Sequence, residues 1–151
     1  MTVVDVHTPE RRSFNMSRIG PKDSAPERQL RRELFARGYR FRLHRKDLPG
    51  SPDIVLPRHN TVIFVNGCFW HLHRCAMFRM PSTRAKYWRT KLTKNAQRDC
   101  AVAQDLLRAG WRVVTVWECA LRGPRRTSPE AVADRIASWL PTSKRLLEIK
   151  S

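Results

Sequence analysis

The segment from residue 53 to residue 65 decides the fold, and it reads DIVLPRHNTVIFV. Asp53–Leu56 is a short apolar stretch that predicts a strand. Thr61–Val65 is apolar and β-branched, which predicts a strand buried on both faces. Pro57–Asn60 separates the two stretches with turn-forming residues. The other predicted elements are arranged before and after this pair of strands.

Three helices are predicted from apolar periodicity and end signals. Pro26 suits a first helical turn, and Gly38 suits the position just after a helix. Thr127 with Glu130 resembles a capping box, and Pro141 stops the last helix. The predicted helices are Ser24–Arg37, Thr83–Ala109 with a break near Asn95, and Thr127–Leu140.

Two further strands complete the expected sheet. Apolar and polar side chains alternate over residues 39–44, and Trp111–Trp117 is a second β-rich stretch. The resulting order is helix, three strands, helix, strand, helix, which favours one α/β domain with a mixed sheet flanked by helices. We expect an N-terminal arm over residues 1–20, the folded domain over 21–141 and a frayed C-terminal tail over 142–151.

The chain is strongly basic, with 30 Lys and Arg against 13 Asp and Glu and a formal net charge of +17. A folded basic domain of this kind typically binds nucleic acid, and the alternative is a ribosomal or otherwise generic basic protein. Residues 61–100 hold 8 basic side chains and a single acid, Asp99. Asp99 is either a helix-surface charge paired with Arg98 or Lys94, or an acid required by a metal.

The length and the apolar pattern exclude several other classes of protein. The 151 residues suit a single domain, and the longest apolar run, Val62–Val65, is far shorter than the roughly 18 residues of a membrane span. The first thirty residues contain no apolar core of a secretory signal. Without such a signal, four cysteines argue against a disulfide framework. Because no apolar run is long enough to span a membrane, no membrane partner is expected.

A cluster of Cys and His side chains lies between residues 68 and 75. Cys68, His71, His73 and Cys75 fall within eight residues, and Cys119 follows a predicted strand that could return it to this loop. Zinc prefers four nitrogen or sulfur ligands, so we favour a Cys68–His73–Cys75–Cys119 site that leaves His71 free. The alternatives are His71 in place of Cys119, or thiols without metal. Cys100, in the middle of a predicted helix, is expected to be a small core residue.

The same loop carries large aromatic side chains. Phe69 and Trp70 stand among polar and basic residues, and Trp88 follows in a basic helix. Such side chains either plug the loop onto the core or form a wedge between base pairs, with nearby Lys and Arg on the phosphates.

Asp53, which follows Pro52 at the start of a short strand, suggests a nuclease site. In such sites an acid on one strand and a carbonyl or acid on the next bind Mg²⁺ against a phosphate. Glu27 on the first helix is placed to hydrogen-bond metal-bound water. A turn-starting Asp is the simpler alternative.

Three motifs together resemble one known family. They are LPGSPD at residues 48–53, GCFWH at 67–71 with His73 and Cys75, and VWECALRG at 116–123. This combination resembles the very short patch repair (Vsr-type) endonucleases, which belong to the restriction-endonuclease-like superfamily. The resemblance runs from about Ser13 to Leu140, and Asn15-Met16 and the stretch Pro81–Arg84 also fit the pattern.

The resemblance implies a three-layer α/β/α restriction-endonuclease-like core with a structural zinc site. It implies a strand-specific nickase that cuts double-stranded DNA 5′ of the thymine in T:G mismatches left by deamination of 5-methylcytosine. Such an enzyme is expected to act as a monomer in the bacterial cytoplasm, associated with the nucleoid, and alongside mismatch-repair proteins. Residues 1–20 would then be a DNA-contacting arm.

The resemblance also implies a role for individual residues. Asp53 would bind Mg²⁺ together with the Val65 carbonyl, and His71 would be the general base. Glu27 and Asp99 would hold metal-bound waters, and Cys68, His73, Cys75 and Cys119 would bind Zn²⁺. The DNA-contacting residues would be Met16, Phe69, Trp70, Arg84, Trp88, Lys91 and Lys94.

One position departs from the family pattern. Many members carry His where this chain has Asn66, at a position that the resemblance places close to the scissile phosphate. Asn can donate a hydrogen bond but cannot carry a proton charge, which argues against a second acid–base role here but not against the metal chemistry. The alternatives to a mismatch nickase are a zinc-stabilised nucleic-acid-binding module without activity and a related nuclease of different specificity.

Overall fold

Strand β3 (Thr61–Asn66) is the middle strand of a five-stranded mixed sheet. The computed structural model describes residues 24–151. β3 pairs antiparallel with β2 (Ile54–Leu56) and parallel with β4 (Arg112–Trp117). The three strands predicted at 53–56, 61–65 and 111–117 are therefore confirmed to within one residue at each end.

The two edges of the sheet differ from the prediction. The strand expected over residues 39–44 is confined to β1 (Arg42–Leu43), and His44 leaves the strand with a φ of 50°, in the left-handed region. The predicted frayed tail at 142–151 was wrong. It contains β5 (Leu146–Ile149), which pairs parallel with β4 and buries Ile149. The strand has only four residues, and the open edge of β4 supplies its hydrogen-bond partners.

The three predicted helices are found, with two differences from the prediction. The described helices are α2 (Ala25–Ala36), the short 3-10 helix η1 (Pro57–His59), α3 (Ala85–Arg108), α4 (Glu118–Arg122) and α5 (Pro129–Trp139). The break expected near Asn95 was wrong, since α3 is continuous. The Asn95 side chain donates to the Trp70 carbonyl at 3.0 Å, so it does not compete for the helix backbone. α4 was not predicted.

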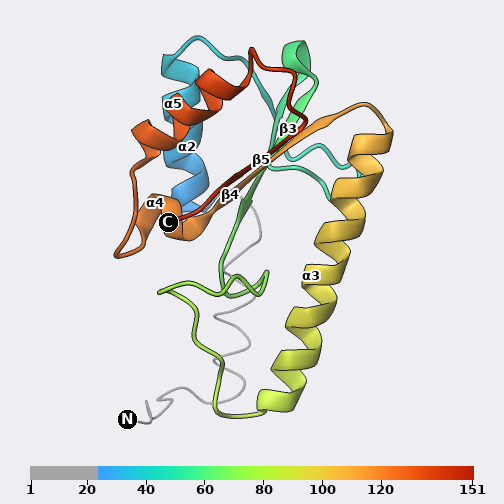
Figure 1. Cartoon of the computed structure of the whole chain (residues 1–151), viewed down its shortest axis with the longest axis vertical. Coiled ribbons are helices and arrows are strands. Elements are labelled where there is room, and N and C mark those ends of the chain that lie inside the picture. Colours follow the sequence, from blue (N-terminus) through green and yellow to red (C-terminus); the bar gives the residue numbers. More distant parts are fainter. Residues whose placement is uncertain (1–23) are drawn as a thin grey trace.

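Helices cover both faces of the sheet, which gives three layers (Figure 1). On one face, Ile54, Ile63 and Val114 pack against α2, α4 and α5. On the other, Val55, Val62 and Val113 pack against Leu106 and its neighbours on α3. Successive strand residues alternate between the two cores, so both faces of β2 and β3 are buried, as the apolar pattern predicted.

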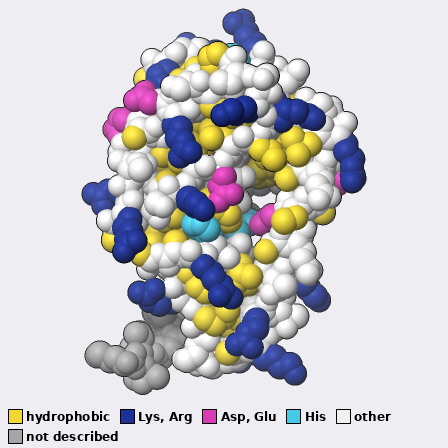
Figure 2. Space-filling view, in the orientation of Figure 1, with side chains coloured by type: hydrophobic (Ala, Val, Ile, Leu, Met, Phe, Trp, Pro, Cys, Tyr) yellow, Lys and Arg dark blue, Asp and Glu magenta, His cyan; other side chains and the backbone are white. Residues whose placement is uncertain are grey.

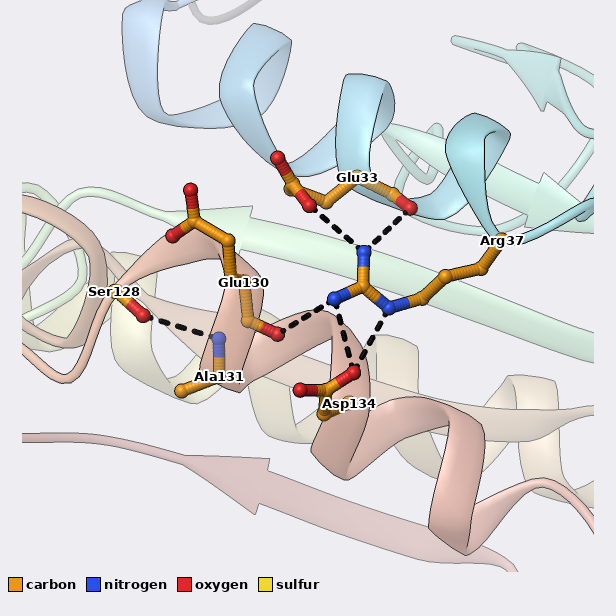
Figure 3. Close-up of polar contacts among 6 residues, drawn as sticks. All are labelled: Glu33, Arg37, Ser128, Glu130, Ala131 and Asp134. Atoms are coloured by element: carbon orange, nitrogen blue, oxygen red, sulfur yellow. Dashed lines mark hydrogen bonds and ion pairs between the residues drawn. The ribbon is translucent and has the colours of Figure 1, made fainter.

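Arg37, the residue that caps α2, connects that helix to α5 (Figure 3). Its Nη1 donates to a Glu33 carboxylate oxygen at 2.8 Å, and its Nε donates to Asp134 Oδ1 at 2.9 Å. Its Nη2 donates to the Glu130 carbonyl at 3.2 Å. Ser128, rather than Thr127, caps α5 by accepting from the Ala131 amide at 3.0 Å. These contacts fix the layer that lies opposite α3.

Two further features of the helices bear on the predictions. Cys100 is exposed on α3, so the prediction of a small core residue was wrong: the position faces away from the side of α3 that carries Leu106. None of the helices in residues 24–151 combines the length and the apolar character of a membrane-spanning segment.

Candidate active site and metal centre

A cavity of about 490 Å³ opens at the carboxyl end of β3. Its lining includes five side chains or backbone groups that the sequence predicted to be functional: Asp53, Val65, Asn66, His71 and Asp99. They come from β3, from the residue before β2, from the loop after β3 and from α3. The structure therefore brings together residues that are up to 46 positions apart in the chain.

Asp53 is positioned by the pairing of β2 with β3. Ile54 is opposite Ile63, so the residue before Ile54 lies beside the last residues of β3. The Val65 amide donates to Asp53 Oδ2 at 2.8 Å, which fixes the carboxylate at the cavity. Asp53 is only 9% exposed, and a buried carboxylate needs such partners.

His71 and Asp99 form a pair across the cavity. His71 Nδ1 lies 2.5 Å from Asp99 Oδ2. A carboxylate on Nδ1 requires the proton there, which leaves Nε2 able to accept another. Among the described residues the ion-pair partner of Asp99 is this histidine, while Arg98 donates to Asn95 instead. The pair is partly exposed, so its contribution to stability is small and its effect is on ring orientation.

Glu27 lies outside this cavity but close to Asp53. It is 1% exposed on α2, and its Oε2 accepts from Arg31 Nη1 at 3.1 Å. The same oxygen lies 3.3 Å from His44 Nε2. The sequence did not single out His44, because its place in an alternating stretch predicted only the polar face of a strand.

The four predicted metal ligands lie together. One ligand atom from each of Cys68, His73, Cys75 and Cys119 lies within 4.8 Å of the others, so the group could hold a metal ion. His73 Nδ1 is 3.5 Å from Cys68 Sγ and 3.7 Å from Cys119 Sγ. Ligand atoms about 2.0–2.3 Å from a tetrahedral metal are about 3.3–3.8 Å apart, which fits these distances. The geometry thus selects Cys119, not His71, as the fourth member.

The parallel register of β3 and β4 explains this grouping. The last register pair is Asn66 with Trp117, and Cys68 and Cys119 each follow two residues later. Both cysteines are buried. Trp117 also stacks on the His73 ring, with centroids 4.2 Å apart and planes at 14°.

The four side chains differ in how close they are to the protonation state that a metal requires. Burial raises the pKa of the Cys68 thiol far above its usual range, and burial lowers the pKa of His73. A neutral imidazole is already in its ligand form. A metal ion would stabilise the thiolate that burial otherwise disfavours.

The loop aromatics form a cluster with Trp88. Phe69 lies 5.0 Å from Trp70 and 5.5 Å from Trp88, and Trp70 lies 6.0 Å from Trp88, all between ring centroids. Trp88 is 9% exposed, whereas Phe69 and Trp70 are partly exposed. The buried Trp88 ring therefore supports the two loop rings from below.

The predicted basic contacts lie on the first half of α3 and at its N-terminus. Arg84, Lys91 and Lys94 are exposed at the start of α3 and along it. Lys91 Nζ lies 5.9 Å from the Trp70 ring centre. Figure 2 shows acidic and His side chains near the centre of one face, with Lys and Arg side chains around them. Met16 lies outside the described residues.

Comparison with known proteins identifies the family. The family model described as DNA mismatch endonuclease Vsr matches residues 4–77. The DNA mismatch endonuclease Vsr of Escherichia coli (strain K12) is 43% identical over 138 residues, which cover 91% of this chain and 88% of that protein. The chain belongs to the Vsr family. This confirms the resemblance found in the sequence, and the Vsr-family chain is an endonuclease.

Other Vsr-family relatives are nicking enzymes. The type II nicking enzyme V.XorIIP of Xanthomonas oryzae pv. oryzae is 47% identical over 79% of this chain and 88% of its own length. The type II nicking enzyme V.NmeAIP of Neisseria meningitidis is 40% identical over 80% of this chain and 86% of its own length.

Purified protein is expected to hold about one tightly bound metal ion per chain at the Cys68–His73–Cys75–Cys119 group. Cys75→Ser should lose that ion, because it removes one of four ligands. Cys100→Ser is the matched control, because Cys100 is exposed on α3 outside the group, and it should keep the ion. The check is elemental analysis of protein dialysed against a weak chelator, and equal metal content in both variants would contradict the assignment.

Proposed function

We propose that this chain is a Mg²⁺-dependent endonuclease that nicks double-stranded DNA 5′ of the thymine in T:G mismatches made by deamination of 5-methylcytosine. The nick would start very short patch mismatch repair. The observation that carries this proposal is the cavity that holds Asp53 beside the His71–Asp99 pair. The names of the relatives support mismatch and nicking chemistry, and the three layers suit a restriction-endonuclease-like core.

The donor set at Asp53 fits a hard divalent cation. Carboxylate and carbonyl oxygens are the ligands that Mg²⁺ prefers, and Asp53 and the Val65 carbonyl would supply them. When bound, the ion activates the attacking water and neutralises charge on the phosphate. The Val65 amide keeps the Asp53 carboxylate in place, since it donates to one of its two oxygens.

His71 is the proposed general base. Its Nε2 takes a proton from the attacking water, while the proton on Nδ1 stays in the bond to Asp99. The Asp99 carboxylate then stabilises the imidazolium that forms. This task differs from the water-holding role that the resemblance implied for Asp99, and the 2.5 Å contact supports the pairing with His71.

Asn66 is the proposed hydrogen-bond donor to the scissile phosphate. It ends β3, is 9% exposed and lines the cavity. Its amide can position a phosphate oxygen without taking up or releasing a proton. His71 is then the single acid–base group that we assign to the step.

The mismatch would be selected by Phe69 and Trp70, supported by Trp88. A T:G pair stacks poorly and costs less to open, so a wedge discriminates by deformation energy. Arg84, Lys91 and Lys94 would grip phosphates without reading sequence. Zn²⁺ in the Cys68–His73–Cys75–Cys119 group would hold the loop that carries both the wedge and His71.

We assign the chain to bacterial cytoplasm as a monomer, with DNA at the nucleoid and mismatch-repair proteins as partners.

Asp53→Asn should reduce Mg²⁺-dependent nicking of a T:G duplex by at least about 10³-fold, because a metal ligand of this kind is worth several kcal/mol in the transition state. Binding of the same duplex without Mg²⁺ should change by less than about threefold. Asp105→Asn, an exposed acid on α3, is the matched control and should nick normally. Wild-type protein that fails to nick T:G duplexes would contradict the proposal.

A double-mutant cycle separates the two roles of Asp99. His71→Ala should cost about 10²–10⁴-fold in the single-turnover nicking rate. Asp99→Asn should cost less, and the double variant should be no slower than His71→Ala, because Asp99 acts through His71. Losses that multiply would instead favour Asp99 as a holder of metal-bound water.

A further inference from the structure

His44 lies between two buried carboxylates and completes a second group of metal-binding side chains. Leu43 is opposite Ile54 in the β1–β2 pair, and the next step of the ladder places His44 beside Asp53. The His44 amide donates to the Asp53 carbonyl at 3.1 Å, which fixes that position. Glu27 reaches the same place from α2.

The three side chains converge tightly. His44 Nε2 is 3.3 Å from Glu27 Oε2, and His44 Nδ1 is 3.8 Å from Asp53 Oδ1. One ligand atom from each residue lies within 4.8 Å of the other two. The two nearest contacts use different ring nitrogens of His44, and one cation would bind only one of them. Ligands bonded at about 2.1 Å lie about 3 Å apart when adjacent and about 4.2 Å apart when opposite, so one cation fits the group after small side-chain shifts.

The ring nitrogens of His44 form no hydrogen bond among the described residues, 24–151. Both ring nitrogens are also buried. A buried polar atom without a hydrogen bond is rare in folded proteins, and an ion that is absent from the coordinates is one of the recognised explanations.

We propose that Glu27, His44 and Asp53 bind a divalent cation, with a His44 nitrogen as a direct ligand. A nitrogen ligand favours first-row transition ions such as Mn²⁺ over Mg²⁺, which prefers oxygen alone. Asp53 also belongs to the catalytic cavity, so the use of this ion in nicking rests on the proposed function. Binding itself does not, because Asp53 turns Oδ1 toward His44 while Oδ2 holds the Val65 amide.

The test is a Mn²⁺ titration of the full, zinc-loaded chain without DNA, in which electron paramagnetic resonance reports free Mn²⁺. Wild-type protein should bind about one Mn²⁺, and Mg²⁺ should compete only at concentrations at least about tenfold higher. His44→Gln should weaken Mn²⁺ binding by about tenfold or more and Mg²⁺ binding much less. His59→Gln, a histidine in η1 outside the group, should bind both ions as wild type does.

A second variant and a variant-free measurement guard against misfolding. Glu27→Gln should weaken both ions to a similar degree, because it removes an oxygen ligand. In the wild type, Mn²⁺ should broaden the imidazole proton resonances of His44 more strongly than those of His71. Unchanged Mn²⁺ affinity and unchanged Mn²⁺ preference in His44→Gln, or no broadening at His44, would overturn the proposal. A chain that binds Mn²⁺ through His44 yet does not nick T:G DNA would refute the proposed function and leave this site standing.

Discussion

The register of β3 between β2 and β4 is the constraint on which the rest of the structure depends. Its antiparallel side places Asp53 against Val65, and its parallel side ends at Asn66 and Trp117. A slip by one residue would turn every side chain of β3 to the opposite face. The buried pattern on both faces of β2 and β3 makes such a slip costly, so packing in the two cores sets the positions of the site residues.

The register of β3 also determines where the loop that follows it, residues 67–84, places its functional side chains. Residues 67–84 form turns and irregular loop with no regular helix or strand. This loop carries His71 and the two partly exposed rings of the aromatic cluster, Phe69 and Trp70. Cys68 and Cys119 each lie two residues after the last register pair of β3 and β4. His73 and Cys75, further along the loop, lie in the same group of side chains. A metal ion there would fix the loop at both ends of the segment around His71. Placement of the base and of the wedge would then be coupled through a few residues.

The sequence pattern predicted those helices and strands whose formation depends on residues close together in the chain. The strands on either side of Pro57–Asn60 and the helix after Ser24 were found because apolar spacing and caps are visible within a few residues. β5 was missed because its stability comes from the edge of β4, which lies about thirty residues away. Asn95 suggested a break in α3, but its amide is satisfied by Trp70 on a distant loop.

In the candidate site, too, residue type and motif predicted some members, whereas others depend on contacts between distant parts of the chain. Asp53 and the Cys and His ligands were predicted from residue type and from the resemblance. The structure places Asp53 in the cavity with His71 and Asp99, and gathers the four Cys and His ligands in a separate group. His44 was missed, because only the β1–β2 pairing and the approach of α2 reveal that it faces Glu27 and Asp53.

The proposed strand-specific nicking depends on rigid placement of a general base and an aromatic wedge beside Asp53. The most direct measurement is to map the cut, with each strand end-labelled in turn, on T:G, T:A, C:G and other mismatched duplexes with randomised flanks. The account predicts one cut, 5′ of the mismatched thymine, on the thymine strand alone and only with a divalent ion. Cutting of both strands, or equal cutting of T:A and T:G duplexes, would contradict it.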